Sequence, residues 1–113
     1  MKSNQQYFNN WASIVMSIEK YIITNPIPRN NNRKTGIDSE VDCFFQNLRM
    51  TTIINEDDSE ITLAYSDELI YRPGSKKIIE EYLETAFAKL LNVKCEFHII
   101  PIGEILDKEM GLT

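Results

Sequence analysis

The order in which hydrophobic periodicity changes along the chain restricts its fold more than any other feature. Apolar residues recur at helical spacing over residues 5–24 and again from residue 38 onward, and then alternate at strand spacing in two short segments. Helical spacing returns over residues 75–92, and a last alternating segment covers residues 94–100. The sequence therefore predicts two helices, a strand hairpin, a third helix and a final strand, an ααββαβ order of the α+β class.

The first two helices are each predicted from one apolar face. In the first helix this face is formed by Phe8, Trp11, Val15, Ile18 and Ile22. Pro26 and Pro28 end that helix. In the second helix the apolar face is formed by Val41, Phe44, Phe45 and Leu48. Ser39 and Asp42 have the spacing of an imperfect capping box, which predicts a helix start near residue 38 or 39.

The strands and the third helix predict a small mixed sheet. Residues 50–55 and 60–66 read as an antiparallel hairpin, joined by a charged and solvated turn at 56–59. Ser75 is the expected N-cap of the third helix, and Asn92 is expected to end it. Because a strand–helix–strand connection is right-handed, the second and third strands should run parallel. This gives a KH-like shape, with three strands packed against helices.

Length and composition indicate one domain. The chain has 113 residues, of which 1–101 are expected to form a single interaction domain. Residues 102–113 are weakly amphipathic, and both a frayed helix and the start of a linker are compatible with them. The net charge of −5 argues against broad, sequence-independent binding of nucleic acid.

The expected setting is the cytoplasm. No apolar run approaches the about 18–20 residues of a membrane-spanning helix, and the N-terminus does not read as a secretory signal. Cys43 and Cys95 both lie in apolar stripes, so we expect two buried thiols, and nothing in the sequence supports a disulfide between them.

The sequence contains few residues arranged in a way that would support catalysis. His98 is the single histidine, and it lies on the last predicted strand, where a structural or solvated role is expected. Neither cysteine has histidine or carboxylate neighbours at the spacing of a metal site. The charged segment 56–60 lacks the glycine and the closing glutamate of a calcium loop. We therefore expect no enzymatic activity, no cofactor and no metal.

Basic residues gather in two places and leave two interpretations open. Arg72, Lys76 and Lys77 crowd the start of the third helix, where free amides attract phosphate. The loop at 25–37 holds a second group, which consists of Arg29, Arg33 and Lys34. These residues either make weak contact with single-stranded nucleic acid or belong to solvated turns. The Gly-x-x-Gly loop of a KH nucleic-acid domain is missing.

Several segments carry a resemblance to a known family. The first helix contains Asn-Trp-Ala-Ser-Ile at 10–14, and the second reads acid–apolar–x–x–aromatic–apolar–x–x–Leu at 40–48. The second strand at 61–66, the third helix at 78–83 and the last strand at 95–99 continue the pattern. In element order and in these segments the chain resembles the N-terminal domain of the bacterial replication initiator DnaA.

The resemblance implies protein contacts without catalysis. In that family the domain self-associates through the first helix near its tryptophan, which corresponds to Trp11. It docks the replicative helicase or regulators through an acidic residue of the second helix and an apolar residue after the second strand. These correspond to Glu40, which we expect to be exposed, and to Leu69 or Ile70. Weak contact with single-stranded DNA is implied as well.

The sequence leaves open the position of Trp11 and the functional class of the chain. Trp11 lies on an apolar stripe, so it is either a core residue or a partly exposed anchor for association. The chain is either an interaction module of the initiator type, a KH-like module that binds single-stranded nucleic acid, or a small free-standing regulatory protein.

Overall fold

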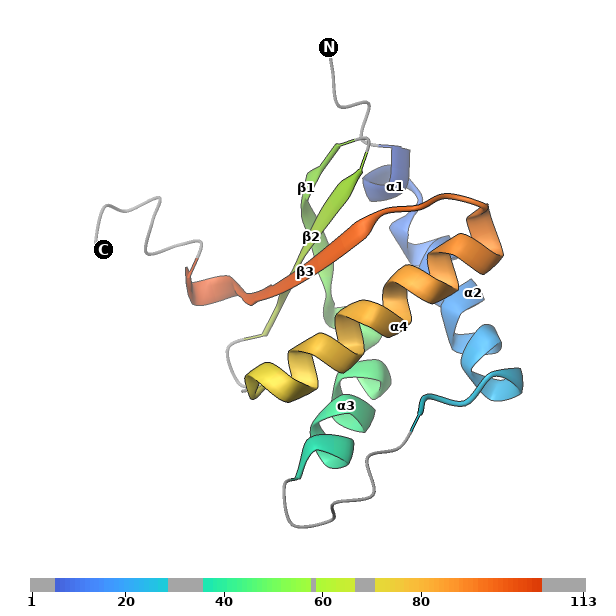
Figure 1. The fold of residues 1–113 in the computed structure, drawn as a ribbon. Coiled ribbons are helices and arrows are strands. Elements are labelled where there is room, and N and C mark those ends of the chain that lie inside the picture. Colours follow the sequence, from blue (N-terminus) through green and yellow to red (C-terminus); the bar gives the residue numbers. More distant parts are fainter. Residues whose placement is uncertain (1–5, 29–35, 58, 67–70, 105–113) are drawn as a thin grey trace.

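The computed structural model describes residues 6–28, 36–57, 59–66 and 71–104. Its elements are, in chain order, α1 (Gln6–Asn9), α2 (Trp11–Thr24), α3 (Ile37–Gln46), the 3₁₀ turn η1 (Leu48–Met50), β1 (Thr52–Glu56), β2 (Glu60–Tyr65), α4 (Pro73–Leu91) and β3 (Glu96–Pro101). Figure 1 shows the long helix α4 crossing the sheet, with α2 and α3 beside it.

The predicted α+β class and mixed sheet are confirmed. The strands lie in the order β1-β2-β3, with β1 antiparallel to β2 and β2 parallel to β3. Alternate residues of β2 and β3, such as Ile61, Leu63 and Phe97, are buried beneath α4, whereas Glu60, Glu96 and His98 are exposed. One face of the sheet therefore carries the core, and the opposite face is open to solvent at Glu60, Glu96 and His98.

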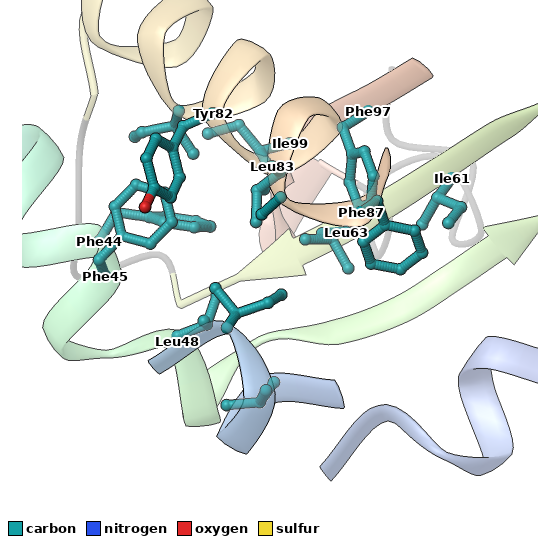
Figure 2. Packing of buried hydrophobic residues seen from close by; sticks show 14 of the residues in the cluster. Phe44, Phe45, Leu48, Ile61, Leu63, Tyr82, Leu83, Phe87, Phe97 and Ile99 are labelled. Atoms are coloured by element: carbon teal, nitrogen blue, oxygen red, sulfur yellow. The ribbon is translucent and has the colours of Figure 1, made fainter. Parts of the chain in front are cut away.

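The core is built by the apolar faces that the sequence indicated. Val41, Phe44, Phe45 and Leu48 are all buried, as the helical spacing predicts. Figure 2 shows Leu83 and Phe87 of α4 pointing toward side chains of the sheet, and the rings of Phe87 and Phe97 meet edge to face at 4.7 Å. Aromatic pairs of this kind add to the free energy gained by burial. The sheet and the helices thus form one continuous core.

The prediction of one continuous helix over residues 5–24 was wrong, because the structure has two helices there. A turn at Asn10 separates α1 from α2, and Phe8 is exposed rather than part of the apolar face. Tyr7 takes the inward position instead, and its ring lies 5.3 Å from that of Phe87. Glu56 fixes the start of α1, because its carboxylate accepts hydrogen bonds from the backbone amides of Tyr7 and Phe8.

The charged hairpin turn is only partly solvated. Glu56 is buried at the end of β1, where it satisfies the free amides of α1, so the expectation of a solvated turn was wrong for this residue. Asp57 is exposed and accepts bonds from the amides of Ser59 and Glu60, which shape the turn and lower the pKa of its carboxyl group.

Two helix starts differ from the prediction. Gly36 has a left-handed φ of 74° and precedes α3, so Ser39 lies inside the first turn rather than at the cap. Pro73 is the first residue of α4, where proline is favoured because that position donates no helical hydrogen bond. Ser75 consequently lies within the helix and is fully buried. Asn92 ends α4 in the left-handed conformation, as expected.

The predictions for the two cysteines and for the C-terminal tail are confirmed only in part. Both cysteines are free, as expected, but only Cys95 is buried and Cys43 is half-buried. Residues 102–104 are helical, and the rest of the tail lies outside the described residues.

Candidate functional site

Glu40 joins α3 to the start of α4 instead of standing free. Its carboxylate accepts hydrogen bonds from Ser75 Oγ at 2.6 Å and from the Arg72 amide at 2.9 Å. Arg72 Nε lies 3.1 Å from the second oxygen of the same carboxylate, and the Glu40 side chain is only 20% exposed. The expectation that Glu40 is exposed was therefore wrong, since its carboxylate is engaged inside the molecule, and its contact with a partner stays a prediction.

The electrostatics of Glu40 agree with a structural role. Burial opposes ionisation of the carboxyl group, but the hydrogen bonds from Ser75 and Arg72 and the charge of Arg72 outweigh it. Together they lower the pKa of Glu40 below its ordinary value, because they stabilise the carboxylate form. Negative charge near the first turn of α4 is also favoured by the helix dipole.

Trp11 belongs to the core, which resolves one of the open alternatives. Its side chain is 7% exposed, and its ring lies 6.3 Å from that of Phe87. The indole Nε1 donates to Thr51 Oγ1 at 3.1 Å, which satisfies the polar end of the ring. The alternative of a partly exposed tryptophan anchor is therefore wrong, and the remaining exposed part of Trp11 lines a surface depression.

Such a depression lies between α2 and η1. It has a volume of 360 Å³ and is lined by Trp11, Ala12, Val15, Met16, Arg49 and Thr51. Arg49 lies across the rim and binds Glu19 of α2 through two nitrogens, at 3.1 and 3.0 Å. This ion pair neutralises the charged part of the rim, so the depression offers mainly apolar contact.

Large apolar side chains are exposed on α2 and η1, and one of them, Met16, lines this depression. Met16 is 52% exposed, Ile23 is 78% exposed and Met50 is 68% exposed. Residues at steps of four, three and four lie on one side of a helix, so Ile23 follows Met16 along a single stripe of α2. We call the group the α2–η1 surface, and it consists of Ala12, Met16, Glu19, Ile23, Arg49 and Met50.

Sequence reasoning missed this surface. The stripe of α2 that predicted the helix is its buried face, and Met16 and Ile23 lie off that face. The sequence did contain a signal for this surface, because Met16 and Ile23 are large apolar residues on the otherwise polar side of an amphipathic helix.

The predicted basic patch is only partly present in the described residues. Arg72 is engaged by Glu40, Lys76 is half-buried and Lys77 is exposed at the start of α4. Five other predicted site residues lie outside the described residues: Arg29, Arg33, Lys34, Leu69 and Ile70. Among the described residues, Trp11 and Glu40 lie on different elements, and the grouping of the remaining predicted site residues stays a prediction.

One group of metal-ligating side chains does come together on the open face of the sheet. The ligand atoms of Glu60, Glu96 and His98 lie within 4.8 Å of one another. All three side chains are exposed. Cys95 precedes Glu96 but is buried on the core side, where burial raises the pKa of its thiol.

Comparisons with protein-family models, with curated proteins and with solved structures give no match to this chain. The resemblance to the replication initiator thus stays a prediction from pattern and element order. In the part of the chain that the structure describes, no helix combines the length and apolar character needed to cross a membrane.

Proposed function

We propose that this chain is a non-catalytic protein-interaction module of bacterial replication initiation. In this proposal it works in the cytoplasm, docks a replicative helicase or a replication regulator through the α2–η1 surface, and self-associates weakly. The observation that carries the proposal is the exposure of Met16, Ile23 and Met50 on α2 and η1, with Met16 lining an apolar depression.

Burial of these side chains supplies a driving force for docking. A large apolar side chain gains about 1.5–3 kcal/mol when it is fully removed from water, and Met16, Ile23 and Met50 are each more than half exposed. Methionine adapts its shape to different partners, which suits a surface that meets more than one protein. The Glu19–Arg49 pair at the rim supplies polar contacts around the apolar centre.

The resemblance sets the biological context of the proposal. It places self-association on the first helix, and the α2–η1 surface lies on the helix that begins with Trp11. Trp11 supports this surface from below and so contributes to docking without being exposed. The nucleic-acid alternative has weaker support, because the net charge is −5 and Arg72 is already paired with Glu40.

Affinity capture from native cell lysate tests the proposal. The bait proteins are the wild type, Met16→Glu and, as a matched control, Leu91→Glu, which places the same charge on an exposed apolar position of α4. We expect the wild type and the control to capture a replicative helicase, an initiator or a regulator, and Met16→Glu to lose it.

Two results would contradict the proposal. One is equal capture of such a protein by all three baits. The other is recovery of nuclease-sensitive material alone, released steeply as salt rises from about 50 to 200 mM, which is the behaviour of phosphate contacts. Thermal unfolding of each bait checks that the variants are folded.

A further inference from the structure

The open face of the sheet brings three metal-ligating side chains into fixed positions. Glu60 of β2 and Glu96 of β3 are paired directly in the parallel register. His98 lies two residues beyond Glu96, so its side chain points to the same face of the sheet. The amide of Glu96 also donates to the Ser59 carbonyl at 2.7 Å, which fixes the two strands next to the group.

The distances suit a metal ion after small side-chain rotations. His98 Nε2 lies 3.8 Å from Glu60 Oε1, and the ligand atoms of all three residues lie within 4.8 Å of one another. Bonds of 2.0–2.2 Å to a tetrahedral Zn²⁺ place ligand atoms about 3.3–3.6 Å apart. Because all three side chains are exposed, they can close this difference without disturbing the core.

We infer that Glu60, Glu96 and His98 form a binding site for a divalent transition-metal ion, with Zn²⁺ as the best fit. Two carboxylates balance the charge of the ion, and an imidazole favours zinc and similar metals over magnesium and calcium. Three protein ligands leave at least one position for water or for a donor from another molecule.

The site is separate from the proposed docking function. It lies on the sheet, whereas the α2–η1 surface lies on a helix and a 3₁₀ turn. The sequence did not predict it, because Glu60 and His98 are far apart in the chain and meet only through the register of β2 and β3. Failure of one proposal therefore leaves the other intact.

Calorimetric titration of the chain with zinc chloride tests the inference. We expect one ion per wild-type chain and a higher melting temperature with zinc, because binding to the folded state stabilises it. Glu60→Gln and Glu96→Gln should each weaken binding by at least about tenfold, since replacing even a supporting residue of a metal site has an effect of that size. His98→Ala should abolish binding.

Glu81→Gln is the matched control, because it removes the same charge from an exposed glutamate of α4. Three outcomes overturn the inference: no binding by the wild type, glutamine variants at 60 and 96 that bind like the control, or binding that survives His98→Ala. The second outcome would reduce the site to a single imidazole. The third would show that His98 is not a required ligand and that the metal is held by other groups of the chain.

Discussion

At the scale of single residues, Glu40 shows how a side chain that resembles a docking residue is used to hold the fold. Its carboxylate receives the Arg72 amide and the hydroxyl of the buried Ser75, and it pairs with the Arg72 guanidinium. These contacts join α3 to the start of α4. The Glu40 carboxylate accepts from donors of two residues, Arg72 and Ser75. Removal of the carboxylate leaves a buried hydroxyl without its acceptor.

Glu40→Ala is accordingly expected to destabilise the chain. Loss of a hydrogen-bonded acceptor beside a buried polar group costs about 1–3 kcal/mol. Chemical denaturation of the wild type, Glu40→Ala and the exposed control Glu81→Ala measures the difference. An unfolding free energy for Glu40→Ala that equals that of the control would contradict the structural role.

The charge of Glu40 predicts a dependence on pH. Since the pKa is lower in the folded state than its ordinary value of 4.5, the stabilisation is complete above that value. It is lost as pH falls through the lower folded-state pKa. Glu40→Gln keeps an acceptor but has no charge to lose. The melting temperature of the wild type should therefore approach that of Glu40→Gln as pH falls from about 6 to 3. A difference in melting temperature that stays constant over this range would contradict the prediction.

At the scale of elements, the outer edge of β3 is closed by the helix that precedes it. Glu84 accepts from the Phe97 amide and Glu80 accepts from the Ile99 amide, each at 3.0 Å. The two glutamates are one helical turn apart on α4, so they match amides two residues apart on the strand. Edge strands with free amides invite pairing with other chains, and these carboxylates occupy the donors.

Replacement of both glutamates should open that edge. We expect the double variant Glu80→Ala, Glu84→Ala to show faster hydrogen exchange at the Phe97 and Ile99 amides. It should also associate more at high concentration, because the freed donors can pair with another strand. Exchange rates by NMR and sedimentation velocity measure these effects. Unchanged exchange at both amides would show that the carboxylates do not protect the edge.

The sequence pattern anticipated elements better than it anticipated their ends. Val41, Phe44 and Phe45 repeat at helical spacing, and periodicity alone decides which face of such a helix is buried. The start of α4 was misplaced because Pro73 competes with Ser75 as the local signal. Phe8 was misplaced because the first helix is broken at Asn10 and α1 is held at its start by hydrogen bonds to Glu56, which is distant in sequence. Long-range hydrogen bonds of this kind are invisible to a local pattern.

At the scale of the whole molecule, each surface has a distinct character. One face of the sheet is covered by α4 (Figure 1). The exposed side chains of Glu60, Glu96 and His98 lie on the opposite face. The α2–η1 surface has the highest exposure of large apolar side chains in the described residues, through Ile23 and Met50. Such surfaces can be predicted only when the packing of the helices and strands is known, because the same apolar residue types also build the core. The candidate site was therefore far less predictable than the fold.

Docking through the α2–η1 surface can be observed residue by residue by NMR, during titration of the chain with the purified protein that it captures. We expect chemical-shift changes to concentrate at Ala12, Met16, Ile23 and Met50. Met16→Glu should remove these changes, whereas Leu91→Glu should not. Shifts concentrated instead at Arg72, Lys76 and Lys77, on addition of single-stranded DNA and not of protein, would contradict docking through this surface.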